Sequence, residues 1–169
     1  PTAQAKPAAK KAIDDALKAK NDAIDARTDL TDEEKTAAKA DAKAKADAAK
    51  QAIDNATTNA GVDQAKTDGA AEVNNVNPMP VAKPEAKKAI EDALKAKEAE
   101  IDSRDDLTSE EKLAAKEEAK AKADVAKQAV DKATTNADVE NAKTTGVVDV
   151  NSLTPVAVKK PEAKKAVDE

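Results

Sequence analysis

Acidic side chains stand next to one another at several points of the chain, and such pairs are the first candidates for metal binding or acid–base catalysis. A calcium loop needs oxygen ligands at fixed spacing around a central glycine, and none of these runs has that spacing. General acid–base catalysis needs a carboxylate held in a dry pocket. We therefore expect solvated helix faces or helix starts here, with no metal site and no cofactor. The runs are Asp14-Asp15, Asp32-Glu33-Glu34 and Asp105-Asp106.

Candidate nucleophiles are limited to a few serines. The serines are Ser103, Ser109 and Ser152, and the chain contains no His and no Cys. A serine nucleophile needs a neighbouring base to activate it, and His is the usual one. Without Cys, disulfides and thiolate metal sites are excluded. We expect no catalytic residue, and so a protein that is not an enzyme.

Basic side chains are interleaved with acidic ones along the whole sequence. The chain has 29 basic and 34 acidic residues, a net charge of -5 and no aromatic residue. Nucleic-acid binding calls for a segregated basic surface, often with aromatic side chains that stack on bases, so we predict no nucleic-acid partner. The arginines, Arg27 and Arg104, occupy equivalent positions, and we expect each to pair with a loop Asp near a helix end. A contact with a partner protein is the alternative.

A repeat organises the whole chain. The segment that begins Lys6-Pro7 returns at Lys83-Pro84 and again at Lys160-Pro161, with an offset of 77 residues each time. About two thirds of the positions in the two complete copies are identical. A period this long indicates a string of similar modules. The third copy is incomplete, which leads us to expect a fragment of a longer array.

The first helix of each copy should start at its proline, which suits the first helical turn, and end near Ala26 or Ser103. The second should start at Thr31 or Thr108, where a Glu three residues on completes a capping box. It should run to about Ala56 or Ala133. Its apolar stripe is mostly alanine: Ala38, Ala42, Ala46, Ala49 and Ile53, then Ala115, Ala119, Ala123, Ala126 and Val130. Leu113 and Val125 lie off that stripe and predict a wider buried face.

A third helix should follow each Thr-Thr-Asn segment, with a glycine, Gly69 or Gly146, in the middle of its apolar pattern. The glycine either lets a neighbouring helix approach closely or ends the helix early, and the continuing pattern favours close approach. Proline then stops the helix and stiffens the linker. Met79, between two prolines, should plug a bundle end, with a ligand-docking spot as the alternative.

These elements predict an all-α fold of two tandem up-down-up three-helix bundles joined by a proline-containing linker, forming an elongated rod. No apolar run reaches the roughly 20 residues of a membrane span. The third copy is too short for a stable isolated helix, so it should be helical only with contacts from a neighbour. The expected organisation is a leader at 1–6, repeats at 7–77 and 84–154, linkers at 78–83 and 155–160, and a truncated repeat at 161–169.

The combination Lys-Pro-x-Ala-Lys, Leu-Thr-x-Glu-Glu-Lys, Ala-Thr-Thr-Asn-Ala-x-Val and a late Gly before a proline linker resembles a known family. It is similar to the alanine-rich helical repeat, a domain of unknown function, found in tandem in SasC-like and Ebh-like surface proteins of Gram-positive bacteria. The resemblance covers nearly the whole chain, and the Leu-Thr-x-Glu-Glu-Lys segment is its most specific part.

The resemblance implies a place and a role. Such repeats form the stalk between an adhesive region and a cell-wall anchor, and they are linked to adhesion and biofilm. We therefore expect a monomeric, extracellular spacer whose neighbours are repeats of the same chain, anchored through parts of the parent protein outside this sequence. The alternative is a helical module that binds a host protein or another cell-surface protein and mediates aggregation.

Overall fold

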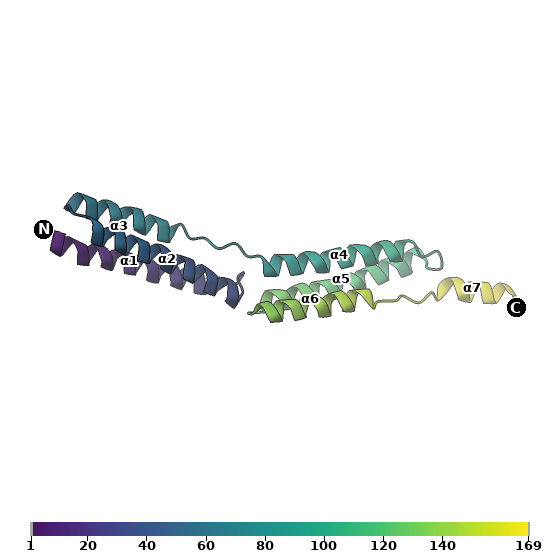
Figure 1. The fold of residues 1–169 in the computed structure, drawn as a ribbon. Helices are drawn as coiled ribbons and strands as arrows, with labels where there is room; N and C mark the ends of the chain where they lie inside the picture. The colour runs from purple at the N-terminus through teal and green to yellow at the C-terminus, as the bar shows by residue number, and fades with distance from the viewer. Residues whose placement is uncertain (1, 169) are drawn as a thin grey trace. The chain divides into compact units, whose positions relative to one another are not determined.

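The computed structural model describes residues 2–168, and the side chains of residues 4–167. Pro1, in the predicted leader, and Glu169, in the predicted third copy, lie outside the described residues. All regular secondary structure within 2–168 is helical, and contacts divide the chain into two units, residues 1–80 and 81–169. The predicted all-α fold with two tandem three-helix bundles is confirmed (Figure 1).

The first unit contains α1 (Thr2–Asp25), α2 (Asp32–Asn55) and α3 (Asn59–Asn74). Each of these helices packs against the other two, and the short turns between them make consecutive helices antiparallel. Because the number of helices is odd, α1 begins at one end of the bundle and α3 finishes at the other (Figure 1).

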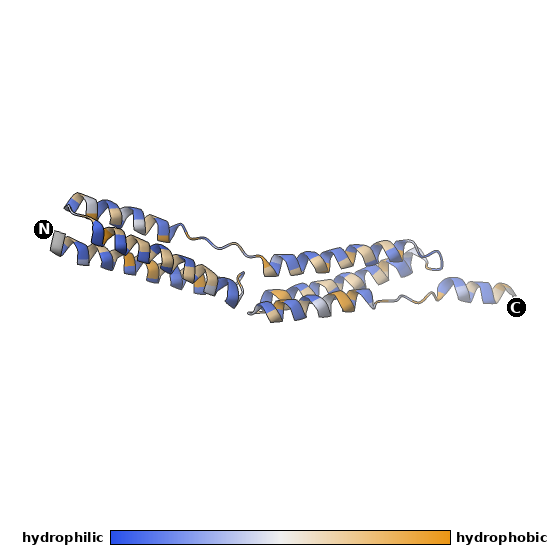
Figure 2. Cartoon of the chain, viewed as in Figure 1, coloured by the Kyte–Doolittle hydropathy of each residue, from blue (hydrophilic) through white to orange (hydrophobic). Residues whose placement is uncertain are grey.

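The second unit repeats this arrangement with α4 (Ala82–Asp102), α5 (Ser109–Lys132) and α6 (Asn136–Asn151), again in mutual contact. It also contains α7 (Lys159–Asp168), the start of the third copy, which follows an extended linker. Along each helix hydrophilic and hydrophobic residues alternate at short intervals, as expected for amphipathic helices (Figure 2).

The helices that open each copy begin before the proline predicted to start them. In α4 and α7 the proline, Pro84 or Pro161, is the third helical residue. The first amides of a helix have no partner within it, so a proline there costs no hydrogen bond and need not come first. In α1, Pro7 lies further inside the helix. The last residues of the segments predicted as leader or linker are therefore helical. These predicted segments are 1–6, 78–83 and 155–160.

The second helix of each repeat buries the alanine stripe that its sequence predicts. Ala42, Ala46, Ala119 and Ala123 are completely buried, so small side chains fill the centre of both bundles. Larger aliphatic side chains supply the rest of the apolar burial. They are Ile13, Ile24, Leu30, Ile53, Val62, Val73 and Val76, then Ile90, Leu94, Ile101, Leu107, Val130, Val139, Val150 and Leu153.

The prediction of a wider buried face on the second helix is wrong. Leu113 is 58% exposed and Val125 is 66% exposed. An alanine stripe lets the neighbouring helices approach so closely that one narrow face suffices for both contacts, and side chains beside that face remain in solvent.

Both glycines of the third helix lie inside it, which confirms the close-approach interpretation. A Cβ atom added to Gly69 would lie 2.3 Å from the Cβ of Ala49, and one added to Gly146 would lie 2.3 Å from the Cβ of Ala126. Real Cβ atoms do not approach so closely, so only glycine fits here without movement of the backbone. Each contact fixes α3 on α2, or α6 on α5, at a distance set by an Ala–Gly pair.

Candidate functional site

The turn that begins the second helix of each repeat is held by paired hydrogen bonds between a threonine and a glutamate. Thr31 Oγ1 accepts a hydrogen bond from the amide of Glu34 at 3.3 Å, and Glu34 Oε1 accepts one from the amide of Thr31 at 2.9 Å. Thr108 and Glu111 repeat this arrangement at 3.1 and 2.9 Å. Both capping boxes predicted from the sequence are confirmed. They satisfy amides that a helix cannot pair by itself and fix where the chain reverses.

The two arginines lie in the same turns and pair with the loop acids that the sequence indicates. Arg27 donates through Nε and Nη2 to both carboxylate oxygens of Asp29, at 2.8 and 2.7 Å. Arg104 does the same to Asp106, at 2.7 Å for each bond. The Arg104 guanidinium lowers the pKa of the Asp106 carboxyl, chiefly through these hydrogen bonds. The pairs stiffen the turn and leave these guanidinium groups engaged within the chain.

The acidic pair on α1 is engaged in ion pairs. Asp14 Oδ1 lies 2.9 Å from Lys50 Nζ on α2, and Asp15 Oδ2 lies 2.9 Å from Lys11 Nζ one turn earlier. Hydrogen bonding to Asp14 raises the pKa of Lys50. Among the described residues, acidic side chains do not gather in groups of three that could hold a metal ion.

Further ion pairs join the first and second helices along their length. Lys10 pairs with Asp54 at 2.9 Å and Lys39 with Asp25 at 2.8 Å in the first unit. The second unit has Lys87–Asp131, Lys116–Asp102 and Lys127–Glu91 at 2.7, 2.9 and 2.9 Å. Sequence reasoning missed these pairs because the partners are 14 to 44 residues apart. The one signal available was that both partners recur with the 77-residue offset.

Two of the serines take structural roles at helix ends. Ser103 Oγ donates to the carbonyl oxygen of Glu100 at 2.7 Å, and Ser152 Oγ donates to that of Asp149 at 3.1 Å. Ser109 is the first residue of α5. Each of these two hydroxyls donates to a carbonyl oxygen in the preceding turn of its own helix, and neither has a neighbouring base that would activate it as a nucleophile.

Met79 does not plug a bundle end, and that prediction is wrong. Its side chain is 73% exposed in the linker between α3 and α4. Pro80 disfavours helical backbone at the residue before it, and Met79 lies in the linker outside both helices.

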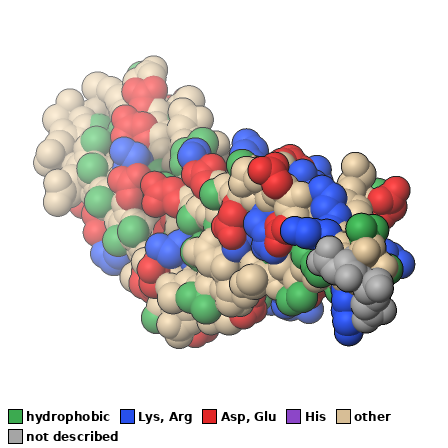
Figure 3. Space-filling view, turned by 90° about the vertical axis from the view of Figure 1, so that its right-hand side faces the viewer, with side chains coloured by type: hydrophobic (Ala, Val, Ile, Leu, Met, Phe, Trp, Pro, Cys, Tyr) green, Lys and Arg blue, Asp and Glu red, His purple; other side chains and the backbone are tan. Residues whose placement is uncertain are grey.

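The surface carries both signs of charge throughout. On the face shown in Figure 3, Lys and Arg side chains lie interspersed with Asp and Glu. Such a surface is well solvated and offers no strong field of one sign to a polyanion. Within residues 2–168, no helix combines the length and the apolar character needed to cross a bilayer.

The chain contains two similar three-helix units, and each is stabilised by a capping box, ion pairs and an Ala–Gly contact. This arrangement defines a tandem helical-repeat protein. The family model described as Domain of Unknown Function (DUF1542) matches residues 5–81 and 82–158, once for each repeat. The chain therefore belongs to the DUF1542 family, in agreement with the resemblance drawn from its motifs. Neither a curated protein nor a solved structure matches it.

Proposed function

We propose that this chain is a structural spacer, a stretch of stalk that sets the distance between two other parts of a longer protein. The observation that carries the proposal is the odd number of helices in each repeat. The chain enters a bundle at one end and leaves at the other, so every repeat moves the chain forward by the length of a helix. For the 24-residue α2 that is about 36 Å at 1.5 Å per residue.

The chemistry of the surface favours this role over catalysis. Many of the groups that could have served a reaction are engaged in caps, turns and ion pairs, among them the Glu34 carboxylate, the Arg104 guanidinium and the Ser103 hydroxyl. We propose accordingly that the repeats have no enzymatic activity. The interleaved charges would keep a long array soluble and its repeats apart from one another.

The setting follows from the family resemblance and belongs to the same proposal. A spacer of this kind would stand outside a Gram-positive cell, anchored to the wall through other segments of its protein, and would project an adhesive region that supports adhesion or biofilm.

Small-angle X-ray scattering on one, two, three and four consecutive repeats tests the geometric core of the proposal. The maximum dimension should grow by a constant step of about 40 Å or more per repeat, a helix length plus a linker. A dimension that stays nearly constant as repeats are added would show bundles folding onto one another and would overturn the spacer.

A replacement experiment separates the spacer from a binding module. In the parent protein, these repeats would be exchanged for an unrelated helical array of equal length, with an array of half that length as the control. A spacer predicts that the long replacement restores adhesion and the short one does not. Failure of both would favour a repeat that contributes binding contacts of its own.

A further inference from the structure

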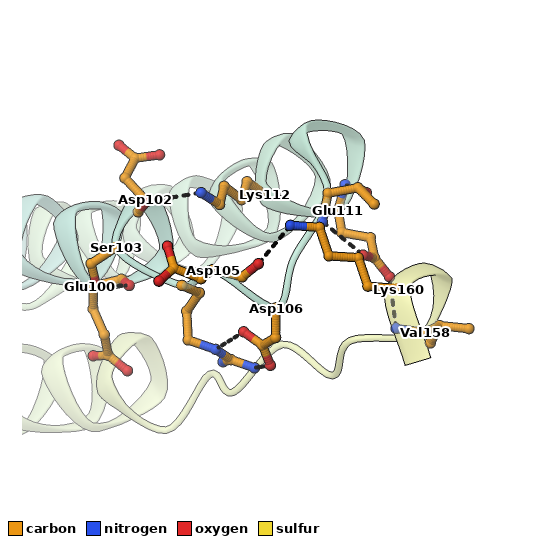
Figure 4. A network of polar contacts seen from close by, with 11 residues as sticks. Glu100, Asp102, Ser103, Asp105, Asp106, Glu111, Lys112, Val158 and Lys160 are labelled. Atoms are coloured by element: carbon orange, nitrogen blue, oxygen red, sulfur yellow. Dashed lines mark hydrogen bonds and ion pairs between the residues drawn. The ribbon is translucent and has the colours of Figure 1, made fainter. Parts of the chain in front are cut away.

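Glu111 has a second set of partners beyond its own helix. Its Oε1 completes the capping box of α5, whereas Oε2 accepts hydrogen bonds from the backbone amides of Val158 at 2.9 Å and Lys159 at 3.3 Å (Figure 4). These amides begin α7, which starts at Lys159. One carboxylate therefore caps both α5 and α7, and the α7 amides that it accepts from lie 47 and 48 residues after it in the sequence.

Two further contacts hold the same segment on the second unit, one of them on the turn between α4 and α5. Lys160 Nζ donates to the carbonyl oxygen of Asp105 at 2.6 Å, on the far side of the turn from Glu111 (Figure 4). Ala157 packs against the hydrophobic core of the second unit. The side chains of residues 159–167 are otherwise exposed. The helix is therefore docked by its first turn and not by an apolar face.

The docked segment is the head of a repeat. Val158-Lys159-Lys160-Pro161 corresponds to Val81-Ala82-Lys83-Pro84, which opens the second repeat. The surface that receives it is the Leu-Thr-x-Glu-Glu turn, which occurs in both complete repeats. Both partners of the contact are thus regular features of the 77-residue unit.

We propose that the turn between α4 and α5, with Glu111 at its centre, is a docking site for the first turn of the repeat that follows. The capping box then has two uses, since it starts its own helix and also orients and starts the next repeat. This inference does not depend on the spacer function, because such a junction would order neighbouring repeats in an array used for any purpose.

The ionisation of Glu111 fits this role. Hydrogen bonds from the amide of Thr108 and then from that of Val158 lower its pKa from 4.5 to about 2. The carboxylate is thus charged at neutral pH, and both of its oxygens act as acceptors.

The variant Glu111→Gln separates the two uses in the full 169-residue chain. Glutamine keeps one oxygen that can accept from the Thr108 amide, as in capping boxes that use Gln, but its NH₂ group cannot accept from Val158 or Lys159. We expect the helical Cα chemical shifts of residues 160–167 to be lost and the amide signals of Val158 and Lys159 to move. The signals at the start of α5 should stay in place.

Glu110→Gln is the matched control, because it removes the same charge from the neighbouring exposed position in the first turn of α5. It should leave residues 158–167 unchanged. Equal loss in both variants would indicate a general charge effect and would overturn the junction. Retained helical shifts in Glu111→Gln would overturn it as well.

Val158→Pro tests the contact from the other side without touching the bundle. Proline removes one donor and suits the residue before a helix. We expect loss of helical shifts in residues 160–167, and no further loss when Glu111→Gln is added, since both changes break the same contact. Additive losses would mean that α7 is ordered independently of Glu111.

Discussion

The two repeats are nearly identical where their helices touch and differ where they meet solvent. Of the core positions buried in both repeats, all but two carry the same residue. The exceptions are Ile53, which corresponds to Val130, and Val76, which corresponds to Leu153. The first change removes a methylene from the second repeat and the second adds one, so the volume of the interior is kept. A core packed around alanine tolerates few substitutions that change its total volume, because a close-packed interior has no empty space to take up the difference.

The larger difference is in how continuous the core is. The second repeat has a single buried cluster, in which Leu94 is 5% exposed. The corresponding Leu17 in the first repeat is only partly buried and packs against two separate clusters. The surfaces differ too, since Leu113, Val125 and Val148 replace small or polar residues of the first repeat. The repeats thus share one scaffold and present different surfaces on it.

The largest effect is expected from the isoleucine that each core shares. Ile13 and Ile90 are both completely buried, and truncation to alanine should lower the free energy of unfolding of that repeat by about 2–5 kcal/mol. Native-state hydrogen exchange followed by NMR resolves the two repeats in one chain. The two variants should agree within about 0.5 kcal/mol. Ile→Val at the same sites should cost about 0.5–1.5 kcal/mol. A clearly unequal pair would refute the idea of one shared scaffold.

The glycine contact should rank next and should distinguish the repeats. Gly69→Ala forces a methyl group onto Ala49, at a cost of about 1–3 kcal/mol that exceeds the gain in helix propensity. Gly146→Ala should cost less, because the added Cβ would lie 3.5 Å from the nearest Ile90 atom but 3.0 Å from Ile13 Cδ1 in the first repeat. The measurement is again hydrogen exchange, resolved by repeat.

Two controls accompany these glycine variants. Ala49→Gly should rescue Gly69→Ala by moving the glycine to the other side of the contact. Gly61→Asp should be harmless, because the second repeat carries Asp138 at that position. A Gly69→Ala variant that proves neutral would show that the helices can separate without cost.

Loss of a capping box should have a smaller effect, similar in both repeats. Thr108→Ala removes the acceptor for the Glu111 amide and should cost about 1 kcal/mol, within a range of about 0.5–2. Thr108→Ser keeps the oxygen and should change little. Thermal unfolding followed by circular dichroism at 222 nm, with Thr31→Ala in parallel, provides the comparison. No change on Thr108→Ala would mean that tertiary packing alone fixes the start of α5.

The surface differences should matter least for stability. Leu113→Thr and Val125→Ala introduce the residues of the first repeat at exposed sites and should change the free energy of unfolding by less than about 0.5 kcal/mol. Chemical denaturation measures this directly. A larger loss would restore the wider buried face that the sequence predicted. Loss of aggregation between cells at unchanged stability would instead favour the binding alternative.

The sequence predicted the elements that rest on local chemistry. The capping boxes follow from Thr-x-x-Glu spacing, the buried face of α2 from the period of its alanines, and the place of Gly69 from an apolar pattern that continues past it. Each of these signals lies within a few residues of what it predicts.

The failures came from effects that act over distance. The exposure of Leu113 depends on how closely another helix approaches, which its own helix does not encode. The starts of α4 and α7 precede their prolines because a proline in the first turn costs nothing. The double use of Glu111 joins groups 47 residues apart, so its capping motif revealed only the nearer partner.

The entry and exit of the chain at opposite ends of each bundle have a mechanical consequence. Tension on an array would run parallel to the helices of each repeat. Alanine contacts and exposed ion pairs resist sliding there, and within residues 2–168 no backbone hydrogen bond joins one helix of a bundle to the next. An opened repeat of 77 residues could extend to about 250–280 Å at 3.3–3.6 Å per residue, from a folded length of about 36 Å. In an optical trap, unfolding steps of this contour length at low force that reverse on relaxation would show that each repeat holds extra length in reserve. Under load, a repeat would then unfold before a bond at the end of the array breaks.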